Sequence, residues 1–121
     1  MKLVAIRGAT CAKNTKDSIQ AQTVELMSKI FSQNNLEMKD IVSIQFSLTK
    51  DLNVYNPAAA LRHGLKDYDV SAVPLFCTQE AYIKGYLKKV IRVLITTYSE
   101  TEPSHVYING AERLRPDLAG K

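Results

Sequence analysis

Residues 90–98, with the sequence VIRVLITTY, form the longest β-favouring stretch of the chain and decide its fold class. Because side chains alternate between the two faces of a strand, this stretch presents two largely apolar faces. They consist of Val90, Arg92, Leu94 and Thr96 on one side and of Ile91, Val93, Ile95 and Thr97 on the other. A strand of this kind is typical of a sheet that is covered on both sides. Arg92 is the exception, because a charge buried there needs an ion-pair partner or a bound anion.

Upstream of this stretch, the pattern predicts a strand and then a long amphipathic helix. The strand is expected within Leu3 to Ala9, ending at Gly8. Thr15 is suited to cap the helix, and Asp17 in the first turn complements the helix dipole. Asn34-Asn35 is expected to stop the helix. Its buried stripe, at spacings of three and four residues, comprises Ile19, Thr23, Leu26, Met27, Ile30 and Phe31.

A second strand and a second helix follow. Residues 41–48 mostly alternate between apolar and polar side chains, which predicts a strand. Asn56-Pro57 is a strong helix start, because asparagine caps free amides and proline fits the first helical position. This short helix is expected to end near Gly64.

Two short strands complete the pattern, at residues 73–77 and 106–108. Pro74 favours an edge or irregular position for the first of them. Five strands and two helices predict a single α+β domain over residues 1–121 with a mixed sheet. Two helices can cover only one face of that sheet, so the other face is expected to need a partner, which predicts an oligomer.

The composition is that of an ordinary folded protein. Hydrophobic residues make up 45% and charged residues 23% of the 121 residues, which argues against disorder. Nothing in the N-terminal residues reads as a signal peptide, and no apolar run approaches the ~20 residues needed to span a bilayer. Cys11 and Cys77 are too few for a disulfide framework and too far apart for a zinc motif. The cytoplasm is therefore the expected location.

The chain is basic, with 16 lysines and arginines against 12 acidic residues. A nucleic-acid surface would need clustered basic residues with aromatic residues between them, but only Lys88-Lys89 adjoin, so no nucleic-acid partner is expected. Two other interpretations stay open. The charge belongs either to a few arginines that hold a small anion or to a solvated basic surface.

Conventional catalytic constellations are hard to build from this sequence. His63 and His105 are the only histidines, and no feature supplies the base that would make Cys77 a nucleophile. No glycine-rich phosphate loop or cluster of metal ligands is present, so neither a metal nor another cofactor is expected.

Arginines occupy the unusual positions instead. Arg7 closes the first strand, Arg92 lies inside the longest one, and Arg115 directly precedes a proline. Arg92 either forms a structural ion pair, for example with Glu80, or binds an anion. The residues alone do not decide between these two interpretations.

Five groups of short segments, in order and with compatible spacing, cover essentially the whole chain. They are IRGAT at 6–10; TKDL and NPAAALR at 49–52 and 56–62; VPL and CTQE at 73–75 and 77–80; LKKVIRV at 87–93; and HVY and LRPDL at 105–107 and 114–118. Each segment alone is a weak signal. Together they resemble the small, monofunctional chorismate mutases of the AroH type.

The resemblance implies a homotrimer in which the sheets pack into a pseudo-α/β barrel, and this packing would cover the second sheet face. It also implies active sites at subunit interfaces, with chorismate as substrate and prephenate as product. One subunit would supply Arg7, Cys77, Glu80, Arg92 and Tyr107. Its neighbour would supply Asn56, Ala58 and Arg62, while Leu114 and Arg115 would close over the ligand.

Roles for these residues follow from the reaction that the resemblance implies. The rearrangement is an intramolecular pericyclic step of phenylalanine and tyrosine biosynthesis, and it needs no nucleophile, proton transfer or cofactor. Negative charge grows on the ether oxygen, where Arg92 would stabilise it. Arg7 and Tyr107 would hold a carboxylate, and Glu80 and Cys77 would contact the ring on its hydroxyl side.

The chain departs from the family pattern at two positions. Asn56 stands where an aromatic residue is usual, and Ala59 where a lysine is common, so a raised KM is expected with kcat less affected. The alternative function is a trimeric small-molecule binding or regulatory protein of the same fold that has lost efficient turnover. Retention of Arg7, Glu80 and Arg92 favours the enzyme.

Overall fold

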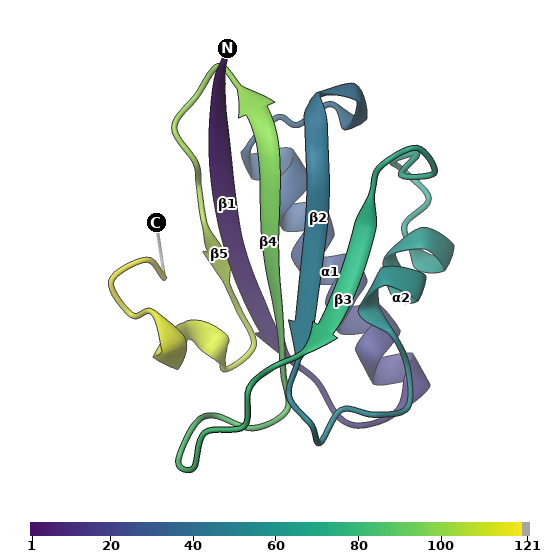
Figure 1. Cartoon of the computed structure of the whole chain (residues 1–121), viewed down its shortest axis with the longest axis vertical. Helices are drawn as coiled ribbons and strands as arrows, with labels where there is room; N and C mark the ends of the chain where they lie inside the picture. The colour runs from purple at the N-terminus through teal and green to yellow at the C-terminus, as the bar shows by residue number, and fades with distance from the viewer. Residues whose placement is uncertain (120–121) are drawn as a thin grey trace.

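The computed structural model describes residues 1–119 as one five-stranded sheet with two helices against one of its faces (Figure 1). The last two residues of the predicted domain lie outside the described residues. In chain order the elements are β1 (Lys2–Cys11), α1 (Lys16–Gln33), η1 (Met38–Asp40), β2 (Ile41–Leu48), α2 (Pro57–Gly64), β3 (Leu75–Gln79), β4 (Val90–Ser99), β5 (Val106–Tyr107) and η2 (Ala111–Leu114). The predicted α+β class, with a mixed sheet and two helices, is confirmed.

The strand that decides the fold lies at the centre of the sheet. The strand order is β3-β2-β4-β1-β5, so β4 pairs with β1 on one side and with β2 on the other. Both pairings are antiparallel, whereas the outer pairs β2–β3 and β1–β5 are parallel. The register sets Ala9 of β1 and Ser47 of β2 on either side of Arg92. These three positions therefore share one face of the sheet.

Capping residues position both helices as the sequence predicts. The Thr15 side chain accepts a hydrogen bond of 3.1 Å from the Ser18 amide at the start of α1. The six residues of the predicted stripe are the buried residues of that helix. Asn56 accepts a hydrogen bond of 2.8 Å from the Ala58 amide at the start of α2, and Pro57 is the first helical residue. Within residues 1–119, no helix is long and apolar enough to cross a membrane.

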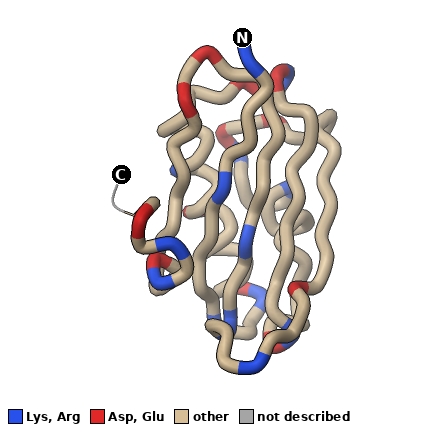
Figure 2. The backbone as a smooth tube through the Cα atoms, turned by 60° about the vertical axis from the view of Figure 1, so that its left-hand side comes forward, with Lys and Arg blue, Asp and Glu red and all other residues tan. Residues whose placement is uncertain are grey.

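The two faces of the sheet have different surroundings. On the helix side, Ile44, Ile91 and Ile95 are fully buried against α1 and α2. On the opposite face, which we call the open face, Leu94 and Tyr98 of β4 remain exposed. Within a single chain the strand is therefore covered on the helix side only, which leaves the other face to the partner that the sequence predicts. Figure 2 shows that charged residues are sparse along the strands, and only Lys2, Arg7 and Arg92 occur within the five strands described.

Two predicted strand boundaries are corrected by the structure. Gly8 does not end β1, which continues to Cys11 opposite Val90. A glycine is needed within the strand because a Cβ there would meet Ile30 Cδ1 of α1 at 2.7 Å. The strand expected at 73–77 begins instead at Leu75, and it is an edge strand.

Candidate active site

A cavity of about 890 Å³ lies on the open face of the sheet, between the loop of residues 80–89 and the C-terminal turn η2. Its lining includes six of the ten residues predicted from the sequence: Arg7, Glu80, Arg92, Tyr107, Leu114 and Arg115. These residues belong to β1, β4, β5 and η2 or directly follow β3 and η2. Because β4 is the central strand, residues that are distant in sequence are brought to one place.

Arg7 and Arg92 are brought together by strand register. Arg7 pairs with Leu94, two residues beyond Arg92 on β4, so the two arginines occupy diagonal positions on the same face. Side chains at diagonal positions are within reach of one another when they are long. The sheet therefore places two guanidinium groups over the same part of its open face.

Arg92 forms an ion pair with Glu80, which directly follows β3. Arg92 Nη1 lies 3.4 Å from Glu80 Oε1, and Ser47 Oγ donates a hydrogen bond of 2.6 Å to the same oxygen. The Glu80 amide donates to the Leu48 carbonyl at 2.8 Å, which fixes the backbone there. Within residues 1–119, Nη1 is the only guanidinium atom of Arg92 with a polar partner. Because the Arg92 side chain is 48% exposed, its other nitrogen atoms remain accessible from the cavity.

His105 supports Arg7 from the side of β5. The Arg7 amide donates a hydrogen bond of 2.9 Å to Nδ1 of His105, so this nitrogen is unprotonated. Burial lowers the pKa of His105, and the positive charges of Arg7 and Arg115 lower it further. This histidine has a structural role, because it binds the backbone of β1 from a position directly before β5.

The C-terminal residues close one side of the cavity. Tyr107 of β5 is 6% exposed and is paired with Ala9 of β1. Arg115 is held by a two-pronged ion pair with Asp117, in which Nε lies 3.0 Å from Oδ1 and Nη2 lies 2.7 Å from Oδ2. Leu114 is the last residue of η2 and is half-buried.

Four predicted site residues lie away from the cavity within one chain. Cys77 stands opposite Phe46 and packs against the core on the helix side, where burial raises the pKa of its thiol. Asn56 caps α2, Ala58 is buried in its first turn, and Arg62 is exposed in its last turn. The prediction that Cys77 and Arg92 of one chain line the same cavity is therefore corrected. Alternate residues of β3 face opposite sides of the sheet, and Cys77 is on the helix side.

Sequence reasoning missed several cavity residues. They are Gln45, Ser47, Thr78, Tyr86, Leu87 and Arg113. A signal for the first two was available, because Ser43, Gln45 and Ser47 are the polar positions of an otherwise apolar strand. No local pattern in the sequence marked Thr78, Tyr86, Leu87 or Arg113 as cavity residues.

The electrostatics of the cavity favour an anion. Its lining carries four arginines, Arg7, Arg92, Arg113 and Arg115, against one carboxylate, that of Glu80. A low-dielectric wall such as this sheet strengthens the attraction for negative charge. An adjoining hollow of about 430 Å³ shares Glu80 and Arg92 with it and adds Lys50 and Lys88. The arrangement suits a compact ligand with more than one negative charge.

The sequence of this chain matches a known protein family over almost its whole length. Residues 3–118 match the family described as chorismate mutase type I. The chain belongs to this family. Among relatives, chorismate mutase AroH of Bacillus subtilis is 37% identical, with 98% of this chain and 94% of that protein covered.

A second relative and a solved structure agree with this assignment to chorismate mutase type I. Chorismate mutase AroH of Thermus thermophilus is 36% identical, with 93% of each chain covered. The structure of a chorismate mutase from Clostridium thermocellum superposes with a TM-score of 0.83 at 39% identity, and 91% of this chain and 98% of that one are covered. The resemblance stated from the sequence is confirmed.

Proposed function

We propose that this protein is a chorismate mutase, which rearranges chorismate to prephenate in aromatic amino-acid biosynthesis. The observation that carries the proposal is the cavity in which Arg7, Arg92 and Glu80 converge on the open face of the sheet. Membership of chorismate mutase type I over residues 3–118 supports the reaction and supports treating the chain as one domain. The alternative, a binding protein without turnover, is not favoured by the relatives' names.

The reaction requires electrostatic stabilisation of a single developing charge. Chorismate carries two carboxylates, and its carbon–oxygen bond breaks ahead of carbon–carbon bond formation, so negative charge grows on the ether oxygen. Arg92 is our candidate for the group that stabilises that oxygen, because its remaining guanidinium N–H groups are accessible from the cavity. A preorganised donor of this kind stabilises the transition state more than the ground state, which raises the rate.

Glu80 keeps the Arg92 guanidinium in place. Its carboxylate is itself fixed by Ser47, so the pair is oriented before substrate binds. The same carboxylate can contact the hydroxyl-bearing side of the ring. Arg7 and Tyr107, with Arg115 on the C-terminal side, are proposed to hold the substrate carboxylates. Binding a folded, reactive conformer adds a positioning contribution.

Charge stabilisation and conformer selection are together large enough to account for the rate acceleration of an enzyme. A millionfold acceleration corresponds to about 8 kcal/mol. One preorganised donor at a developing oxyanion supplies roughly 3–4 kcal/mol of it. Selection of the reactive conformer can supply the remainder, since well-oriented intramolecular reactions gain several kcal/mol. No step requires a side chain to accept or donate a proton.

The active assembly is proposed to be a homotrimer with a pseudo-α/β barrel core. The open face supports this, because Leu3, Leu94 and Tyr98 are exposed there on neighbouring strands of one chain. Asn56, Ala58 and Arg62 of α2 would then reach the cavity of the adjacent subunit. Cys77 packs on the same helix side of the sheet, so any contact it makes with substrate would also come from the neighbour.

The location proposed is the cytoplasm, and the support is that both cysteines, Cys11 and Cys77, are free thiols. The proposed activity is tested by following the loss of chorismate absorbance with purified protein and identifying prephenate as the product. Light scattering of the same sample gives the mass of the assembly. Absence of prephenate at millimolar chorismate, from protein of trimer mass, would contradict the proposed function.

A further inference from the structure

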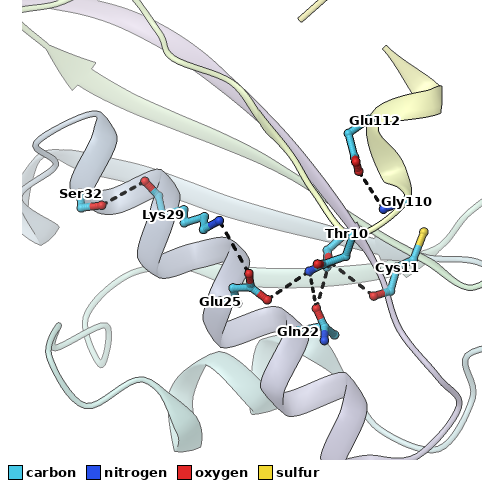
Figure 3. A network of polar contacts seen from close by, with 9 residues as sticks. Thr10, Cys11, Gln22, Glu25, Lys29, Ser32, Gly110 and Glu112 are labelled. Atoms are coloured by element: carbon cyan, nitrogen blue, oxygen red, sulfur yellow. Dashed lines mark hydrogen bonds and ion pairs between the residues drawn. The ribbon is translucent and has the colours of Figure 1, made fainter. Parts of the chain in front are cut away.

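A cluster of polar side chains lies outside the cavity, where the end of β1, helix α1 and the turn after β5 meet (Figure 3). Asn109 is its centre. The Asn109 side-chain nitrogen lies 2.5 Å from Gln22 Oε1 and 3.1 Å from both Thr10 Oγ1 and Glu25 Oε1, so its two N–H groups are shared among three acceptors. One residue of the C-terminal segment is thus tied to both β1 and α1.

The backbone of Asn109 explains why its side chain points to α1. Asn109 and Gly110 both adopt left-handed conformations, with φ of 57° and 99°, and together they reverse the chain between β5 and η2. Asparagine tolerates this conformation better than most residues with a Cβ. The Ala111 amide closes the turn by donating to the Ile108 carbonyl at 3.1 Å, and the Ile108 amide joins the start of the turn to β1 by donating to the Ala9 carbonyl at 3.0 Å.

The turn leads directly into three residues of the cavity lining, Arg113, Leu114 and Arg115. In the segment that carries them, Leu114, Leu118 and Ala119 pack against a small cluster formed by Ala9, Val90, Tyr107 and Ala111. In η2 only Ala111 is buried. The Gly110 amide donates to Glu112 Oε1 at 2.7 Å, a contact within the turn that stabilises its shape but not its position on the domain. Its position therefore depends on these apolar contacts and on the Asn109 amide, which links the turn to β1 and α1.

The three acceptors lie on β1 and α1, and the Glu25 side chain among them is 42% exposed. Thr10 is fully buried at the end of β1. Gln22 and Glu25 lie one turn apart on α1, and Lys29 Nζ is 3.7 Å from Glu25 Oε2, which leaves the other carboxylate oxygen for Asn109. The Asn109 amide thus bonds to residues of β1 and α1, two elements that pack in the main core, and these hydrogen bonds restrain the turn.

We infer that Asn109 is a positioning residue for substrate binding, because its amide holds the turn that presents Leu114 and Arg115 to the cavity. The inference rests on the proposed function. When only a fraction of molecules has the turn in place, the apparent affinity falls by that fraction. Loss of about one net hydrogen bond predicts that KM for chorismate rises about 3- to 10-fold. The value of kcat stays within about twofold, because Arg92 and Glu80 are untouched once substrate is bound.

Three variants test the inference. Asn109→Gly keeps the left-handed backbone and removes the amide, whereas Asn109→Asp keeps the shape but places a carboxylate beside Glu25. Gln22→Met removes an acceptor from α1 without altering the turn. Asn35→Gly is the matched control, since Asn35 is also left-handed, with φ of 49°, at the far end of α1. Combining Asn109→Asp with Gln22→Met is expected to raise KM by less than the product of the single effects.

Two readouts are compared with wild type. Steady-state kinetics with chorismate should show a raised KM and a nearly unchanged kcat for the variants at positions 109 and 22, and no change for Asn35→Gly. Hydrogen exchange without substrate should be faster at the amides of Ala111, Leu118 and Ala119, each of which is hydrogen-bonded in the C-terminal segment.

An unchanged KM in both variants of Asn109, or a fall confined to kcat, would overturn the inference. Exchange rates equal to wild type would overturn it as well. If the wild-type protein itself makes no prephenate, the proposed function fails instead. The exchange experiment then still decides whether Asn109 restrains the turn.

Discussion

Ser47 and Arg92 converge on one atom, because Ser47 Oγ donates to Glu80 Oε1 at 2.6 Å and Arg92 Nη1 lies 3.4 Å from the same oxygen. Ser47 and Arg92 are also paired across β2 and β4. The sheet therefore fixes both the guanidinium and the group that orients the carboxylate beside it. This relationship makes Ser47 part of the active-site architecture although it carries no charge.

Replacing Ser47 with alanine should loosen Glu80 without unfolding the sheet. We expect kcat/KM for Ser47→Ala to fall about 10- to 160-fold, the loss expected for a hydrogen bond of about 1.5–3 kcal/mol to a charged group. Ser43→Ala is the control, since Ser43 lies on the same strand but outside the cavity. Equal kcat/KM values for the two variants would show that Glu80 does not need this hydrogen bond.

Gly8 should tolerate no larger side chain. A Cβ at this position would meet Ile30 Cδ1 at 2.7 Å and the Val106 carbonyl oxygen at 3.1 Å. We expect Gly8→Ala to lower the free energy of unfolding by about 1–3 kcal/mol, as overpacking of a well-filled core does. Urea denaturation measures the change, and a midpoint at or above that of wild type would contradict the expected close contact.

His105 should make stability depend on pH below neutrality. Its pKa is lowered by burial and by the charges of Arg7 and Arg115, so the unfolded chain binds this proton more readily than the folded one. The contribution to stability is complete above the unfolded pKa of about 6.5 and is lost as the pH falls through the folded value. Urea midpoints between pH 7.5 and 5 should therefore fall more for wild type than for His105→Asn. Parallel curves for the two proteins would show that another group is responsible.

The sequence predicted the fold well where local patterns decide it. The stripe of α1, the caps at Thr15 and Asn56, and the alternation in β2 and β4 each depend on neighbouring residues only. Gly8 was misjudged because its reason is tertiary, namely the contact with Ile30 of α1. Periodicity could place Arg92 in a strand, but only strand order shows which face of the sheet remains open.

The candidate site was predicted mainly from the family resemblance, and the structure refines it. Cys77 shares a segment with Glu80, yet its side chain faces the helix side, which sequence proximity alone could not reveal. Arg113 and the Asn109 cluster were missed because η2 has no periodic signal, and its position depends on contacts with residues about 85–100 positions away. Such long-range polar contacts leave no local pattern in a sequence.

The most direct test of the central claim is the kcat of Arg92→Ala for chorismate, measured beside wild type with thermal unfolding of both proteins as a check on folding. If Arg92 stabilises the charge on the ether oxygen, kcat should fall by at least about 10²- to 10³-fold, the loss seen when one oxyanion donor is removed. Arg92→Lys should retain part of the rate, because it keeps the charge but not the geometry of the guanidinium. A kcat within about tenfold of wild type for a folded Arg92→Ala protein would contradict the account and assign the oxygen to another group.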